Sequence, residues 1–198
     1  MRRRTFLIGV AALPVAGGSP PIRTCEDWGA RPPQEPLVLV GRPVRILIHH
    51  TATANSDDLS IGHAYELARW IQDLHMDTNG WADSGQHFTI SRGGVLMEGR
   101  HGSRDALEAG DRMVVGAHCP GQNDRAIGIE NEGIYMDTVP PQQQWDSLVQ
   151  FCAHVCDRYN IPTTEIFGHR DFFVTQCPGD ALYAMLPRLR SEVAAQFR

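Results

Sequence analysis

Histidine and cysteine residues near the ends of two predicted strands carry the strongest chemical signal in this sequence. His49 and His50 end one apolar, β-branched run, and His169 ends another, eight residues before Cys177. Side chains alternate between the faces of a strand, so only one of His49 and His50 easily points into a given site. Two imidazoles and a thiolate leave a tetrahedral zinc ion one open position, as in catalytic zinc sites. Spacing alone leaves two alternatives, a disulfide at Cys177 and histidines that are merely buried and hydrogen-bonded.

Five blocks of sequence resemble, in the correct order, successive motifs of one family. They are residues 46–52, residues 80–88, residues 115–118, residues 127–130, and residues 168–179. The chain is similar, over roughly residues 22 to 195, to the peptidoglycan recognition protein and zinc amidase family. The resemblance implies a single α/β domain with a central mixed β-sheet flanked by helices.

The same resemblance implies a Zn²⁺ cofactor and its ligands. The family binds zinc through the positions that are His49, His169 and Cys177 in this sequence. Family members that lack this cysteine generally bind peptidoglycan without cutting it. The presence of Cys177 therefore favours an enzyme.

Glu130 is implied as the catalytic base. Many amidases of the family carry a catalytic tyrosine where this chain has Gln86, and glutamine cannot ionise. Residues 127–133 resemble instead the block of bacterial amidases that recycle anhydro-muropeptides, in which the first glutamate is the base. On a strand, Glu130 and Glu132 would share the side of Gly128, so a carboxylate directed at the site is reasonable. An ordinary pair of solvent-facing acids is the alternative.

The remaining candidates for catalysis and substrate binding are Thr175 and several aromatic or polar residues. The Thr175 hydroxyl is expected to stabilise the oxyanion, at a place where relatives have lysine or threonine. The substrate-binding candidates are His50, Trp81, Gln86, His87 and His118. Alternatively, His50 supports the metal site from beneath, and His87 and His118 are structural. Trp81 is expected to stack on a sugar ring, and the alternative is that it covers the core.

Hydrophobic periodicity predicts the elements that must position these residues. Apolar and β-branched runs predict strands, residues repeating every three or four positions predict helices, and a glycine pair predicts a hairpin turn. The predicted elements are a strand over 44–50, a helix over 64–74, a hairpin over 87–98 and a strand over 126–130. They continue with a helix that Pro140 and Pro141 open and whose apolar stripe runs over 145–159, a strand end at 166–167, and a helix from 180 that Pro187 bends or breaks.

The first residues resemble an export signal. Residues 1–18 combine arginines, a short apolar run and small residues, and the stretch from Arg3 to Leu7 resembles the twin-arginine type. A frayed basic N-terminus is the alternative. The expected location is outside the cytoplasm, in the cell wall, the periplasm or the medium, and the amidase domain is expected over residues 22–198.

Five cysteines in a chain of this size are typical of a protein in an oxidising compartment. Cys152 and Cys156 lie four apart in a helical pattern, so a bond between them would be strained, and one of them more plausibly pairs with Cys25. The resemblance makes Cys177 a metal ligand, which leaves Cys119 and the other three cysteines for up to two disulfides.

The composition excludes several functions. The 198 residues are 42% hydrophobic and 21% charged, which is typical of a globular domain, and the net charge of −5 disfavours nucleic acid or an anionic membrane as partner. All basic residues are arginines, so no lysine nucleophile or Schiff base exists. We expect no stable membrane span and a monomer.

Together, these features predict an exported zinc-dependent N-acetylmuramoyl-L-alanine amidase that acts on peptidoglycan or muropeptides. The bond cut would be the amide between the muramyl lactyl group and L-alanine. A non-catalytic peptidoglycan-binding module is the alternative, favoured by Gln86. A third reading is an enzyme that acts on another amide.

Overall fold

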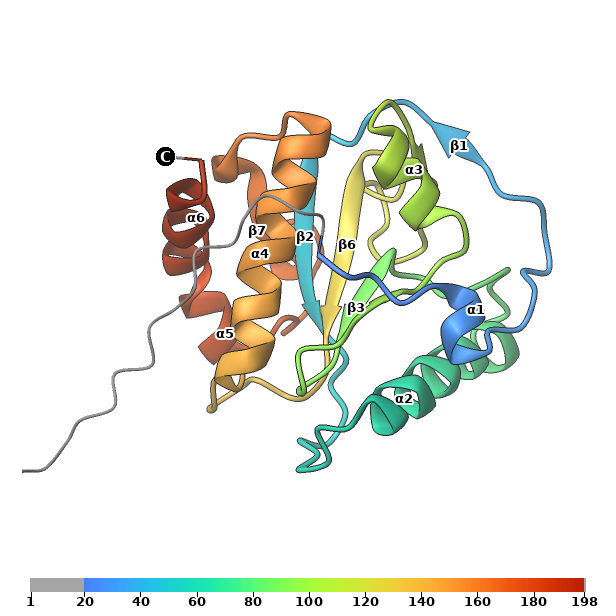
Figure 1. Cartoon of the computed structure of the whole chain (residues 1–198), viewed down its shortest axis with the longest axis horizontal. Helices are drawn as coiled ribbons and strands as arrows, with labels where there is room; N and C mark the ends of the chain where they lie inside the picture. The colour runs from blue at the N-terminus through green and yellow to red at the C-terminus, as the bar shows by residue number, and fades with distance from the viewer. Residues whose placement is uncertain (1–19, 198) are drawn as a thin grey trace, which may run out of the picture.

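The computed structural model describes residues 20–197, so the predicted export signal at residues 1–18 lies outside the described residues. Helices and strands alternate along the chain (Figure 1). The strands are β1 (Leu39–Val40), β2 (Arg45–His50), β3 (Phe88–Ile90), β4 (Leu96–Glu98), β5 (Met113–Val114), β6 (Ala126–Asn131) and β7 (Ile166–Gly168). The α-helices are α1 (Cys25–Trp28), α2 (Ile61–Asp73), α3 (Ser103–Ala109), α4 (Gln142–Tyr159), α5 (Asp180–Ala184) and α6 (Leu186–Ala195).

The central sheet has five strands in the order β4-β3-β6-β2-β7. β2 runs parallel to β6 and β7, β3 runs parallel to β6, and β4 pairs antiparallel with β3. All residues of β2 after Arg45 are buried, which fits a continuous apolar run in the middle of a covered sheet. This mixed sheet confirms the predicted fold class. β1 and β5 form a separate two-stranded antiparallel sheet.

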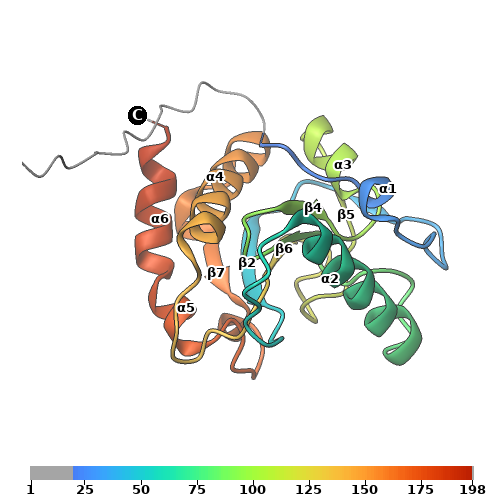
Figure 2. The ribbon, with the colours of Figure 1, turned by 60° about the horizontal axis from the view of Figure 1, so that its bottom comes forward.

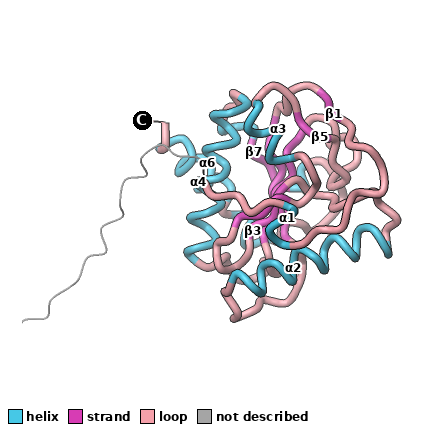
Figure 3. Tube along the Cα trace, turned by 45° about the vertical axis from the view of Figure 1, so that its right-hand side comes forward, coloured by secondary structure: helices cyan, strands magenta, loops and turns pink. Residues whose placement is uncertain are grey.

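Helices cover both faces of this sheet. Figure 2 shows α4 and α6 on one side of the strands and α2 on the other, and Figure 3 shows the strands enclosed by helices and loops. Under α4 and α6 lies the main core, which includes Ile46, Ile48 and Ile129. Burial of each such side chain contributes about 1.5–3 kcal/mol of transfer free energy. On the other face, Trp28 of α1 and Ala64 of α2 belong to a smaller cluster.

The helix ends follow local sequence signals. The Ser60 side chain accepts a hydrogen bond from the His63 backbone N–H at 3.2 Å and so begins α2. α4 ends at Tyr159, and the next residue, Asn160, has a φ of 57°, the left-handed conformation typical of a helix C-terminus. The predicted interruption near Pro187 is confirmed, because α5 ends at Ala184 and α6 begins at Leu186 with the proline in its first turn.

The predicted disulfides are wrong. All five cysteines lie in the described part of the chain, and all are free. Cys152 and Cys156 project from α4 into the main core, whereas Cys25 belongs to the cluster of α1 and α2 on the opposite face. Cys119 packs in a third cluster. The sheet therefore separates the cysteines that the sequence suggested as partners.

The parallel strands place their carboxyl ends at one edge of the sheet. His49 and His50 end β2, Glu130 lies near the end of β6, and His169 directly follows β7. The register sets His49 beside Glu130. Ligand sites of open α/β sheets form outside the carboxyl ends of their strands. Among residues 20–197, no helix combines the length and apolar character needed to cross a membrane.

Candidate metal centre

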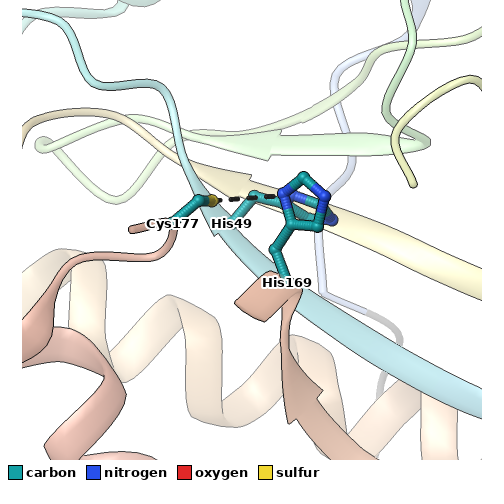
Figure 4. Close-up of side chains that lie close together, drawn as sticks. All are labelled: His49, His169 and Cys177. Atoms are coloured by element: carbon teal, nitrogen blue, oxygen red, sulfur yellow. Dashed lines mark hydrogen bonds between the residues drawn. The ribbon is translucent and has the colours of Figure 1, made fainter. Parts of the chain in front are cut away.

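His49, His169 and Cys177 come together from three separate segments. One nitrogen of each imidazole and the Cys177 sulfur all lie within 4.8 Å of one another. Figure 4 shows the two imidazoles and the thiol converging from β2, from the turn after β7 and from the loop before α5. The fold thus brings the three predicted ligands to one place.

The arrangement fits a tetrahedral zinc ion. His49 Nδ1 lies 3.7 Å from Cys177 Sγ. Zinc bonds of about 2.3 Å to sulfur and about 2.0–2.1 Å to nitrogen would separate two tetrahedral ligands by about 3.6 Å. His169 Nε2 is buried and has no hydrogen-bond partner among the described residues. A buried polar atom of this kind is unfavourable unless something binds it, and a metal ion would satisfy it.

The loop that carries Cys177 is held by polar contacts. Thr175 Oγ1 accepts a hydrogen bond from the Cys177 backbone N–H at 3.2 Å, and the sulfur accepts one from the His50 backbone N–H at 3.4 Å. Arg170 forms an ion pair with Asp180 at 2.6 Å and donates a hydrogen bond to the Cys177 carbonyl. Burial raises the pKa of the uncoordinated Cys177 thiol to about 12.

A pocket of about 430 Å³ opens onto these three residues. Glu130 and Thr175 both line it, as their predicted catalytic roles require. Burial raises the pKa of the Glu130 carboxyl to about 8. A carboxyl group that titrates near neutral pH can take up a proton and return it. The pocket therefore combines candidates for a metal centre, a proton carrier and a hydroxyl donor.

Four of the five predicted substrate-binding residues also line this pocket, namely His50, Trp81, Gln86 and His118. Gln86 is only 1% exposed, and its side-chain nitrogen donates a hydrogen bond to Thr89. Its side-chain oxygen has no partner among the described residues. His118 contacts the metal-ligand candidate directly, since its Nδ1 lies 3.0 Å from His49 Nε2.

Two predictions do not fit the observed positions. His87 is 0% exposed and does not line the pocket. Its Nδ1 accepts the Gly128 backbone N–H and its Nε2 contacts the Val114 carbonyl, so the backbone occupies both nitrogens. Glu132 does not accompany Glu130, because the chain leaves β6 after Asn131 and the Glu132 carboxylate contacts His63 at 2.6 Å.

Two residues beside the predicted site were missed. His75 lines the pocket with its ring centroid 4.6 Å from that of Trp81. Arg100 lines a neighbouring pocket of about 260 Å³ that shares Trp81, and its Nε is buried without a hydrogen-bond partner among the described residues. Nothing in the sequence distinguished this arginine from those at the surface.

Two known proteins are similar to this chain in sequence. Peptidoglycan-recognition protein LB of Drosophila melanogaster is 32% identical over 160 residues, which cover 80% of this chain and 64% of that protein. N-acetylmuramoyl-L-alanine amidase of Homo sapiens is 30% identical over 172 residues, covering 85% of this chain and 28% of that protein. The chain thus spans less than two thirds of either relative.

A solved structure shares the fold. A mutant of Drosophila PGRP-LB in complex with tracheal cytotoxin superposes with a TM-score of 0.73 at 31% identity, covering 83% of this chain and 92% of that one. The family profile described as N-acetylmuramoyl-L-alanine amidase matches residues 40–180, a range that holds all three candidate ligands and Glu130. From the profile, the relatives and the fold together, we conclude that the chain belongs to the Amidase_2 family.

Proposed function

We propose that this protein is a zinc-dependent N-acetylmuramoyl-L-alanine amidase. The observation that carries the proposal is the convergence of His49, His169 and Cys177 on a pocket that Glu130 also lines. A module that only binds peptidoglycan has no need of a half-buried carboxyl beside a metal-ligand set. When bound by these three residues, zinc supplies Lewis-acid polarisation of an amide carbonyl and makes water more acidic.

Glu130 moves the proton in this proposal. Amide hydrolysis requires that water lose a proton and that the departing amine gain one. The Glu130 carboxylate accepts the first proton and returns it to the nitrogen, a role for which its place in the pocket beside His49 suits it. Because no tyrosine stands at position 86, Glu130 is the group in this pocket that carries the step.

Thr175 and Gln86 orient the substrate. Thr175 Oγ1 accepts the Cys177 N–H, so its own hydrogen remains available for the oxygen on which negative charge develops. The free side-chain oxygen of Gln86 is an acceptor for a substrate N–H. Trp81 offers an aromatic face to a sugar or a peptide.

The substrate and the location belong to the same proposal. The relative whose structure holds tracheal cytotoxin supports a muropeptide or peptidoglycan as substrate. The bond cut is the amide between the muramyl lactyl group and L-alanine. Residues 1–18 would direct export, by the twin-arginine route, and residues 22–198 would act as a monomer in the cell wall, the periplasm or the medium.

Digestion of purified cell walls tests this proposal. Protein that begins at residue 22 is loaded with zinc, and peptides with a new L-alanine amino terminus are measured together with free muramyl lactyl groups. We expect release by the wild type and a loss of at least about 100-fold in Glu130→Gln. Glu132→Gln is the matched control, since its carboxylate lies outside the pocket.

Wall sedimentation separates the two functional classes. The amidase is expected to bind walls and to release peptides, and Glu130→Gln is expected to bind walls without releasing peptides. A zinc-loaded wild type that sediments with walls and releases nothing would instead establish a binding module. Unchanged release by Glu130→Gln would remove that residue from its proposed role.

A further inference from the structure

Four imidazoles form a row that leads to the candidate metal centre. The ring centroids of His87 and His118 are 5.3 Å apart, those of His118 and His49 are 5.1 Å apart, and those of His49 and His169 are 4.4 Å apart. His49 and His169 are candidate ligands, whereas His118 lies behind them. Its contacts suggest a more specific role than lining the pocket.

The position of each ring hydrogen follows from the neighbouring atoms. His118 Nε2 lies 3.1 Å from the Ala126 carbonyl, which can only accept, so Nε2 carries the hydrogen. His118 is 9% exposed, and within residues 20–197 its ring nitrogens contact the His49 ring and the Ala126 carbonyl but no carboxylate, so a neutral ring is favoured. The other nitrogen, Nδ1, is then an acceptor.

This acceptor selects one tautomer of His49. His49 Nε2 lies 3.0 Å from His118 Nδ1, so it must donate its hydrogen there. His49 Nδ1 is then unprotonated, and it is this nitrogen that faces Cys177 Sγ at 3.7 Å. An imidazole binds a metal through an unprotonated nitrogen, and a hydrogen bond at the opposite nitrogen fixes which one is free.

The surrounding backbone is shaped to hold the His118 ring in place. A Cβ atom added at Gly128 would lie 2.6 Å from the ring, and one added at Gly116 would lie 2.7 Å from it. Asn123 Oδ1 accepts the backbone N–H groups of His118 and Cys119, each at 2.8 Å. The ring therefore fits only because two glycines leave room, and the loop that carries it is anchored.

We infer that His118 is a positioning residue of the metal centre, which accepts the His49 Nε2 hydrogen and thereby reserves the His49 Nδ1 lone pair for the metal. The inference rests on the proposed metal centre. Removal of a partner behind a ligating histidine typically weakens metal binding by about 10- to 100-fold.

Two nearly isosteric substitutions isolate the acceptor. His118→Leu removes both ring nitrogens, whereas His118→Asn offers an oxygen close to the position of Nδ1. Both variants lose the contact with the Ala126 carbonyl, so the difference between them reports on the acceptor alone. His87→Leu is the control, because that histidine is also buried but the backbone contacts both of its ring nitrogens.

The first readout is the tautomer of His49 in metal-free protein, measured by ¹⁵N NMR of the imidazole. We expect the hydrogen on Nε2 in the wild type and in His87→Leu, a loss of that preference in His118→Leu, and its return in His118→Asn. A wild-type His49 that carries its hydrogen on Nδ1 overturns the inference without any variant, even if every substitution unfolds the protein.

The second readout is zinc affinity, measured by competition with a chromophoric chelator. We expect the dissociation constant to rise by about 10- to 100-fold in His118→Leu and to recover in His118→Asn. Unchanged affinity in His118→Leu, or an asparagine variant no better than the leucine variant, overturns the inference. A wild type that shows the expected tautomer and binds zinc but releases no wall peptides contradicts the proposed amidase and not the role of His118.

Discussion

The two faces of strands β2 and β6 serve different purposes. Ile46 and Ile48 of β2 and Ile127 and Ile129 of β6 point toward α4 and α6, and each is at most 2% exposed. On the opposite face, the same two strands present His49 and Glu130 side by side to the pocket. Side chains of a strand alternate with a period of two, so six residues supply both a core and a site.

The comparison shows that the two faces depend on different forces. The apolar face gains free energy from burial in any well-packed arrangement. The pocket face buries groups that are favourable only with a particular partner, and burial has lowered the pKa of His49 and raised that of Glu130. Substitutions should therefore separate stability from activity according to the face they alter.

The largest effect on activity is expected for Cys177→Ala. This variant should lose bound zinc and at least about 1,000-fold of its wall hydrolysis, because two imidazoles alone hold zinc poorly. Its free energy of unfolding without metal should change by only about 1 kcal/mol. Metal analysis, wall digestion and urea denaturation measure these quantities. Cys152→Ala on α4 is the control and should keep both zinc and activity. Full activity in Cys177→Ala would refute the proposed centre.

The opposite behaviour is expected for Phe151→Ala. Phe151 is 0% exposed on α4 and its ring centroid lies 4.7 Å from that of Phe88. Its truncation should lower the free energy of unfolding by about 3–5 kcal/mol. Activity per folded molecule should stay within about twofold, which urea denaturation and assays at low temperature can establish. A large loss of activity without a loss of stability would show that the two faces are coupled.

A smaller effect on binding is expected for Arg100→Gln. Burial lowers the pKa of Arg100, and its Nε has no partner among the described residues, so a carboxylate of the bound peptide is a suitable ligand. Loss of such a contact, worth about 1.5–3 kcal/mol, should weaken muropeptide binding at least about tenfold. Calorimetry measures the affinity. Arg125→Gln, which removes an exposed arginine paired with Asp124, should bind as the wild type does.

The smallest effect is a pH dependence of stability near the pocket. His101 Nδ1 donates to the buried Asp83 carboxylate at 2.9 Å, and this hydrogen bond raises the pKa of His101 above 6.5. Burial alone would raise the pKa of Asp83, but hydrogen bonds from His101 and Gln72 outweigh it and hold the pKa below 3.8.

The directions of the two pKa shifts define the pH range in which this pair stabilises the fold. The His101 contribution is fully present below pH 6.5 and is lost as pH rises through its raised pKa, whereas the Asp83 contribution is present above pH 3.8 and is lost as pH falls through its lowered pKa. We expect His101→Gln to lose about 1 kcal/mol or less, mainly between pH 3.8 and 6.5, in urea titrations. A difference from wild type that does not vary with pH would exclude this linkage.

Local patterns were sufficient for the main strands and helices, whereas the ligand set came from the resemblance to a known family. The apolar run before His49 predicted β2, and the periodic stripe before Asn160 predicted α4, because strand and helix periodicity depend on neighbouring residues alone. The family resemblance implied His49, His169 and Cys177 as ligands, and the structure brings these three together.

Local sequence patterns did not predict the contacts between distant segments of the chain. His87 and His118 look alike in sequence, yet one bonds only to the backbone and the other faces His49. The five cysteines suggested disulfide bonds, but the sheet lies between Cys25 and Cys152. The burial of a side chain and the partner of each polar atom depend on which remote elements pack against it, and no spacing along the chain encodes those distances.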